Sequence, residues 1–218
     1  MSTRESVLAA VGGLALYASF PPIGMWFLAP LGPMLLILAV RGHPKRPAFI
    51  AGLVFGLAFF GPLIAWLANL DLLPWLALTA AQSLIFALAA TALPRLLSAR
   101  AWPLYAAAWW VEVEALRSRA PLGGFPWGKV AFSQADAIYA AWAAVGGAPF
   151  LSFITALFGS LLVYGAVTLR TRRPAVLATA CCVVIAIAAP PLALPGQSGA
   201  GNSAVLVSCA SSCSLDAV

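Results

Sequence analysis

The sequence predicts an all-α membrane protein, a bundle of about seven transmembrane helices with a short interfacial segment. Hydrophobic residues make up 63% of the 218-residue chain and charged residues only 8%, whereas a typical soluble domain has about 25% charged residues. Basic clusters divide the chain into apolar runs, and a bilayer core of roughly 30 Å needs about 20 such residues per helix. The length fits one membrane domain.

We expect this domain over residues 1–195, with spans near residues 6–20, 25–40, 47–68, 75–93, 101–116, 148–167 and 175–194. The first run follows a basic start, as in a signal peptide, but no small-residue cleavage site precedes Phe20, so we expect a retained helix. Prolines interrupt the first two spans and predict a kinked hairpin that turns near the segment FPPIG. Gly52 and Gly56 form a small-xxx-small pair, for which close helix packing and a chance match are both possible.

The basic residues indicate the orientation. Three of the 12, Arg117, Arg119 and Lys129, fall on one side of the expected bundle, and nine fall on the other: Arg4, Arg41, Lys45, Arg46, Arg95, Arg100, Arg170, Arg172 and Arg173. Positive charge is retained in the cytoplasm, so the amino terminus is expected inside and the carboxyl terminus outside. The net charge of +6 is then a topology signal and a contact for anionic lipid, and we expect no nucleic-acid partner. Most of the eight tryptophans lie near expected span ends, as in an interfacial belt.

Ionisable side chains at membrane depth are costly and are candidates for function. Glu114 and Arg117 are three residues apart and share a helix face, so a carboxylate-guanidinium pair is expected, either as a helix-end anchor or as part of a site. Glu112 points away from Glu114, which argues against a two-carboxylate dyad. Asp71 is expected to be a solvated loop residue.

Metal-ion and nucleophilic sites are not indicated. His43 is the only histidine and is expected at the surface, so neither a Ser-His-Asp arrangement nor a histidine-based metal site can form. Cys181 and Cys182 lie in an apolar span, where an inert role is expected. Cys209 and Cys213 lie in the expected outer tail, where either a disulfide or a free thiol is possible.

The segment GGFPWGKVAFSQ, residues 123–134, contains the most distinctive motif of the chain. Gly124 permits unusual backbone angles, Pro126 fixes a turn, and Phe125 with Trp127 present aromatic surface at headgroup level. The following residues, which include Gln134, are too polar for an easy crossing and predict an interfacial or re-entrant piece that walls a groove. A plain loop between two helices is the alternative.

These residues carry a resemblance to a known family. The segment ALR after Glu114, followed by PLGGFPWGKVAFSQ, resembles the acidic-x-Leu-Arg and Gly-Phe-Pro-Trp region of apolipoprotein N-acyltransferases. The runs YASFPPIGMWFLAPLGPMLL and PAFIAGLVFGLAFFGPLIAWL are similar to the first hairpin and the third span of that family. The family usually has tryptophan at the position of Ala115, and Glu112 is extra.

The resemblance implies the transfer of an acyl chain from a phospholipid to the amino group of a lipoprotein's diacylglyceryl-cysteine, without a cofactor, in the bacterial inner membrane. It implies lipid-substrate-binding roles for Glu114, Arg117, Gly124, Phe125, Pro126, Trp127 and Gln134. In the family, a Glu-Lys-Cys triad in an extracytoplasmic nitrilase-like domain performs the chemistry. Residues 196–218 read as the start of that domain, truncated or disrupted by a frame change, so we assign no catalytic residue and expect no activity from this chain alone.

A scaffold role is the alternative function. Some relatives in the family are fused to or associated with a polyprenyl-phosphate mannosyltransferase, and the basic faces around residues 41–46 and 170–173 would then hold that cytoplasmic partner. A small transporter is a weaker option, because no inverted repeat is visible.

Overall fold

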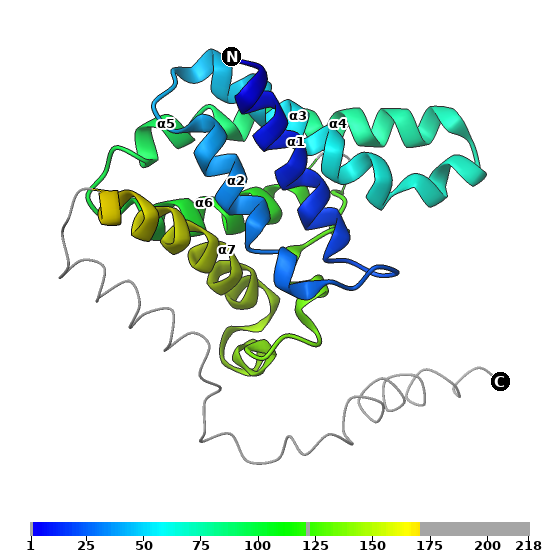
Figure 1. Ribbon diagram of the computed structural model, residues 1–218. Helices are drawn as coiled ribbons and strands as arrows, with labels where there is room; N and C mark the ends of the chain where they lie inside the picture. The colour runs from blue at the N-terminus through cyan, green and yellow to red at the C-terminus, as the bar shows by residue number, and fades with distance from the viewer. Residues whose placement is uncertain (1, 121–122, 171–218) are drawn as a thin grey trace.

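The computed structural model describes residues 2–120 and 123–170, and every regular element in these ranges is a helix (Figure 1). The α-helices are α1 (Thr3–Ala18), α2 (Leu31–Val40), α3 (Lys45–Leu63), α4 (Leu72–Ala90), α5 (Leu93–Leu96), α6 (Trp102–Arg117) and α7 (Ala143–Arg170). Four 3-10 helices connect them: η1 (Trp26–Leu28), η2 (Ala65–Asn69), η3 (Val130–Gln134) and η4 (Ala140–Trp142).

Six of the seven expected spans coincide with a helix or a pair of helices. Within the described residues, three segments are long and apolar enough to cross a membrane: Lys45–Leu63, Leu72–Leu96 and Ala140–Thr168. Helices α1 and α6 have 16 residues each and rise about 24 Å, which is less than a full hydrocarbon core. The structure of the described residues therefore confirms an all-helical fold with three segments that could span a membrane, but not the count of seven. The expected span at 175–194 and the tail at 196–218 lie outside the described residues.

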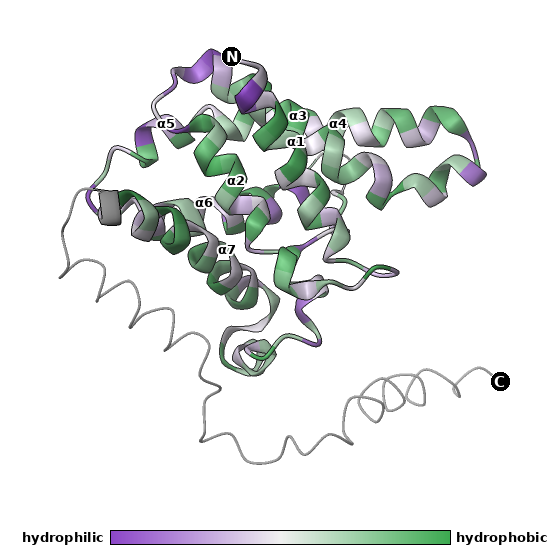
Figure 2. Ribbon diagram, in the orientation of Figure 1, coloured by the Kyte–Doolittle hydropathy of each residue, from purple (hydrophilic) through white to green (hydrophobic). Residues whose placement is uncertain are grey.

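Helices α1 and α2 form the hairpin expected from the prolines. Helix α1 ends at Ala18, and the FPPIG segment reverses the chain before η1 and α2. Helix α1 packs against both α2 and α3. The α3–α4 hairpin projects from one side of the bundle, at the right of Figure 1, and Figure 2 shows that both of its helices are largely hydrophobic.

Close packing of α3 on α4 depends on two glycines, as the small-xxx-small interpretation predicts. A Cβ atom added at Gly56 would lie 2.6 Å from the Cα atom of Ser83, and one added at Gly52 would lie 2.8 Å from the carbonyl oxygen of Phe86. Both contacts are with the backbone of α4, which cannot rotate away. The chance-match alternative is therefore wrong for this pair.

We expect Gly56→Ala to lower the free energy of unfolding by about 2 kcal/mol, because overpacking forces the two helix backbones apart. The measurement is chemical unfolding of the detergent-solubilised chain. Gly61→Ala is the matched control: it lies on the same helix, and its added Cβ would have no atom within 4 Å. Because alanine has a higher helix propensity than glycine, Gly61→Ala should be neutral or slightly stabilising. Equal losses in the two variants would show that the α3–α4 contact does not set the effect.

Aromatic side chains fill the centre of the bundle. Phe55, Phe59, Phe60, Phe86 and Trp110 are all buried and form one connected set of ring contacts. Trp110 therefore belongs to the core rather than to an interfacial belt, and Trp102, at the start of α6, is also largely buried, at 5% exposed. Apolar helices in a bundle must pack against one another as well as against lipid, and residue type alone does not distinguish the two faces.

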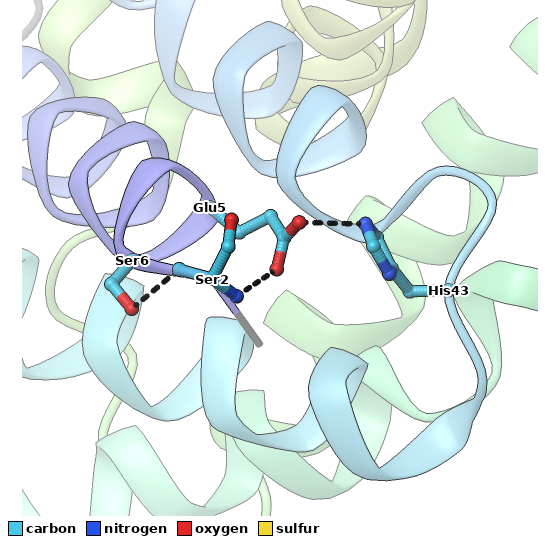
Figure 3. A network of polar contacts seen from close by, with 4 residues as sticks. All are labelled: Ser2, Glu5, Ser6 and His43. Carbon is cyan, nitrogen blue, oxygen red and sulfur yellow. Dashed lines mark hydrogen bonds and ion pairs between the residues drawn. The ribbon is translucent and has the colours of Figure 1, made fainter.

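Polar contacts fix two helix starts that sequence reasoning treated as unremarkable. Asp71 is the N-cap of α4, where its carboxylate accepts from the backbone N–H of Leu73 at 3.1 Å. Glu5 accepts from the backbone N–H of Ser2 and lies 3.0 Å from Nε2 of His43 (Figure 3). The Ser2 hydrogen bond, assisted by His43, holds the pKa of Glu5 below its ordinary value. The contact therefore stabilises the fold at neutral pH and is lost as the pH falls through that pKa.

Candidate functional site

The Gly-Phe-Pro-Trp loop folds back onto the end of α6. Gly124 has φ +83°, and an added Cβ would lie 2.2 Å from the carbonyl carbon of Ser118, so only glycine fits this approach. The backbone N–H of Phe125 donates to the carbonyl oxygen of Arg117 at 2.7 Å. Backbone contacts alone therefore already hold the loop against the end of α6.

Arg117 clamps the loop from inside the bundle. Its guanidinium donates to Oε1 of Gln82 on α4 at 2.8 Å and to the carbonyl oxygens of Trp127 and Gly128 at 3.4 and 3.3 Å. The same group lies over the ring of Phe60, with Cζ 4.6 Å from the ring centroid. The side chain is 1% exposed. One cation therefore joins α4, α6 and the loop.

Glu114 holds the segment that follows the loop. Its Oε1 accepts from the backbone N–H of Val130 at 2.8 Å and from the indole N–H of Trp110 at 3.1 Å. The Ser152 side chain also hydrogen-bonds the carboxylate, and the Ser152 hydroxyl accepts from the backbone N–H of Ala131. Glu114 thus joins α6, η3 and α7.

The expected direct pair between Glu114 and Arg117 does not form. Among the described residues, the ion pair within 4 Å joins Glu5 and His43, whereas Glu114 and Arg117 bind separate sets of partners. The two charges still attract each other at longer range. The buried carbonyl and N–H groups at residues 127–130 need hydrogen-bond partners. Glu114 and Arg117 therefore bind these groups and not each other.

Gln134 anchors the interfacial segment to the first hairpin. Its Nε2 donates to the carbonyl oxygen of Trp26 and to the hydroxyl of Ser133, and its Oε1 accepts from the hydroxyl of Tyr139 at 2.6 Å. The side chain is fully buried. The expected interfacial piece is therefore built from the short helices η3 and η4, packed on α7, rather than from one amphipathic helix.

A pocket of about 400 Å³ lies beside the clamped loop. Its lining is mostly apolar and comes from three segments of the chain: Phe20, Pro21, Leu63, Trp66, Trp127, Gly128 and Phe132. The rings of Trp66 and Trp127 lie 6.4 Å apart, and Phe125 stacks on Trp127. Trp127 remains 56% exposed and Phe132 54% exposed, so the pocket has an apolar rim as well as an apolar floor.

The structure brings the seven predicted site residues into one region but gives them two different positions. Phe125, Pro126 and Trp127 lie on the accessible loop, whereas Glu114, Arg117 and Gln134 are buried behind it. Gln82, Ser152 and Trp66 were missed by sequence reasoning. Of these, Gln82 carried a usable signal, because an amide inside an apolar span needs a polar partner. Among the described residues, no three His, Cys, Asp or Glu side chains could hold a metal ion.

Comparison with known proteins assigns the family. The family model described as the apolipoprotein N-acyltransferase N-terminal domain matches residues 12–161, which is more than half of the chain. The chain belongs to the apolipoprotein N-acyltransferase family. The matched range contains the whole Arg117 clamp, Glu114 with its partners, and every residue of the pocket lining.

Three curated relatives illustrate the similarity, all named apolipoprotein N-acyltransferase. The protein of Mycolicibacterium smegmatis is 38% identical over 68% of this chain and 25% of its own length. The protein of Azotobacter vinelandii is 34% identical over 88% of this chain and 40% of its own length. The protein of Pseudomonas paraeruginosa is 34% identical over 72% of this chain and 34% of its own length. The chain therefore spans two fifths or less of these apolipoprotein N-acyltransferases. Their names give no support to a mannosyltransferase partner.

Proposed function

We propose that this chain is the membrane part of a bacterial apolipoprotein N-acyltransferase and that it presents lipid substrates to a catalytic domain outside the membrane. The substrates would be a phospholipid acyl donor and a diacylglyceryl lipoprotein. The pocket beside Trp127 would take an acyl chain of one of them, and the chain alone would not transfer it. The observation that carries this proposal is the buried Arg117 clamp, which fixes an exposed aromatic loop beside an apolar pocket.

Holding the exposed loop in one conformation costs conformational entropy. A loop with an exposed tryptophan gains little from folding unless its backbone is satisfied elsewhere, and here Arg117 and Glu114 supply hydrogen bonds to the loop and to the segment that follows it from the interior. Trp127 then keeps a fixed position while half of its surface stays available. A preformed apolar site loses less entropy on binding an acyl chain than a mobile one does. The clamp residues would position the loop, whereas Phe125, Pro126 and Trp127 would contact lipid.

The proposed topology places the pocket on the extracytoplasmic side. Figure 2 shows hydrophilic residues at the amino end of α1, the start of α3 and α5, where Arg4, Lys45 and Arg95 lie. These ends would face the cytoplasm by the positive-inside rule. The loop follows the opposite end of α6, so it would lie at the far interface.

Trp127→Ala should lower photolabelling of the chain by a phospholipid that carries a photoreactive acyl tail, by about fivefold, because a large part of the apolar wall is lost. The chain is reconstituted in bilayers, and the labelled peptides are mapped to residues 63–66 and 127–132. Leu88→Ala is the control: Leu88 is 57% exposed, and Trp127 is 56% exposed, but Leu88 does not line the pocket. Equal decreases would mean that labelling reports general lipid exposure and would contradict the pocket assignment.

The same preparation tests the absence of activity. With a diacylglyceryl lipopeptide added, we expect no N-acylated product from the chain alone. Product formed at a rate abolished by Cys209→Ala would refute this part of the proposal while leaving the lipid pocket in place.

A further inference from the structure

Among the side chains that the structure describes at the basic end of the bundle, one cation differs from the rest. Five of the basic side chains are exposed, so water solvates them and counterions screen their charge: Arg4, Lys45, Arg46, Arg95 and Arg100. Arg41, at the end of α2, is only partly exposed. Its Cζ lies 5.2 Å from the ring centroid of Trp102, and its Nη1 is buried without a hydrogen-bond partner. This guanidinium is therefore oriented in advance, with Nη1 turned into the protein and the remaining edge left accessible.

The aromatic support of Arg41 is itself fixed. Trp102 begins α6 and is 5% exposed, and Tyr164 of α7 packs edge-on against it with ring centroids 5.8 Å apart. Three helices thus meet at the guanidinium: α2 carries it, α6 supports it, and α7 braces the support. Because its orientation is set, less side-chain entropy is lost when an anion binds the free edge of the fork.

Exposed apolar side chains flank this cation on the same helices. Leu38 lies three residues before Arg41, and Tyr105 lies three residues after Trp102, so each shares a helix face with its partner. Leu38 is 38% exposed and Tyr105 50% exposed, and the adjacent Leu104 is 51% exposed. A soluble anion would satisfy the guanidinium alone, whereas an amphiphile with an anionic head would also cover these side chains.

We propose that Arg41, held over Trp102, binds the headgroup of an anionic phospholipid in the leaflet at the basic end of the bundle. The phosphate accepts hydrogen bonds from the accessible edge of the guanidinium, and the acyl chains lie along Leu38 and Tyr105. This site lies on the opposite side of the bundle from the pocket at Trp127, and it does not depend on the proposed acyl-chain pocket.

The test is a competition between two lipids. The detergent-solubilised chain is mixed with equal amounts of phosphatidylglycerol and phosphatidylcholine that have identical acyl chains, and native mass spectrometry measures the ratio of the bound species. We expect Arg41→Gln to lower the phosphatidylglycerol preference about tenfold, because it removes charge-assisted hydrogen bonds from an oriented donor. Arg46→Gln makes the same charge change at an exposed position and should lower the preference by less than about twofold.

Two further measurements distinguish this lipid site from diffuse electrostatic attraction and from a site for free phosphate. Arg41→Lys keeps the charge but loses the planar fork and should give an intermediate ratio, whereas Arg46→Lys should leave the ratio unchanged; this pair also decides the question if Arg41→Gln fails to fold. Inorganic phosphate should not displace the lipid. Equal decreases for the Arg41 and Arg46 variants would show diffuse attraction and overturn the proposal, as would displacement by phosphate alone.

Discussion

Arg117→Met should lower the free energy of unfolding by about 3 kcal/mol, because removing one member of a buried charged network leaves its other members unsatisfied. The variant keeps the volume of the side chain but cannot donate to Gln82 or to the carbonyl oxygens of Trp127 and Gly128. It also leaves the buried Glu114 carboxylate without its nearby positive charge. The measurement is chemical unfolding in detergent micelles, followed by tryptophan fluorescence.

A second measurement separates the clamp from general stability. The loop contains Lys129, so the rate of trypsin cleavage at this site under native conditions reports release of the loop. We expect Arg117→Met to raise that rate by at least about tenfold, because local opening follows the loss of the bonds that hold the segment. The cleavage rate of Arg117→Lys should lie between those of Arg117→Met and the original chain, because an ammonium group keeps the charge but lacks the fork that reaches two carbonyls.

Arg119→Met is the matched control for this prediction. Arg119 follows the end of the same helix but is exposed, so its replacement should change stability by less than about 0.5 kcal/mol. A destabilised Arg117→Met chain whose loop remained protected from trypsin would show that Gly124 and Glu114 hold the loop without the guanidinium. The assignment of Arg117 as the clamp would then be wrong.

Gly124→Ala should also lower the free energy of unfolding by about 3 kcal/mol, because it combines an unfavourable left-handed φ with a direct backbone collision. The added Cβ would lie 2.4 Å from the backbone nitrogen of Arg119 as well as 2.2 Å from the carbonyl carbon of Ser118. Neither atom belongs to a flexible side chain, so the loop must separate from the end of α6. The hydrogen bond from Phe125 to Arg117 would be lost at the same time.

Gly123→Ala provides an unusually close control. Gly123 also has a positive φ, +93°, but an added Cβ would have no atom within 4 Å. Its replacement should therefore cost only the backbone strain, about 1 kcal/mol. The difference in unfolding free energy between the two variants measures the collision. A difference near zero would mean that the loop does not rest on α6 in solution.

The positions of the helices were largely predictable from the sequence. Apolar runs between basic clusters must form helices in a membrane, because lipid cannot satisfy free backbone groups. The positions of glycine and proline likewise predicted three local features: the turn at FPPIG, the close approach at Gly52 and Gly56, and the distinctive loop at residues 123–128. These features depend on local chemistry, namely on which residues can adopt a turn, approach a backbone or lie in an apolar phase.

The partners of the buried polar groups were decided only by tertiary structure. Helical spacing correctly put Glu114 and Arg117 on one face, but it could not reveal that Val130 and Gln82 compete for them from 16 and 35 residues away. The pocket likewise joins Phe20 to Trp127, which no local pattern connects. Periodicity determines which face of a helix is buried, whereas the partner that satisfies a buried charge depends on which distant backbone groups the fold leaves unpaired beside it.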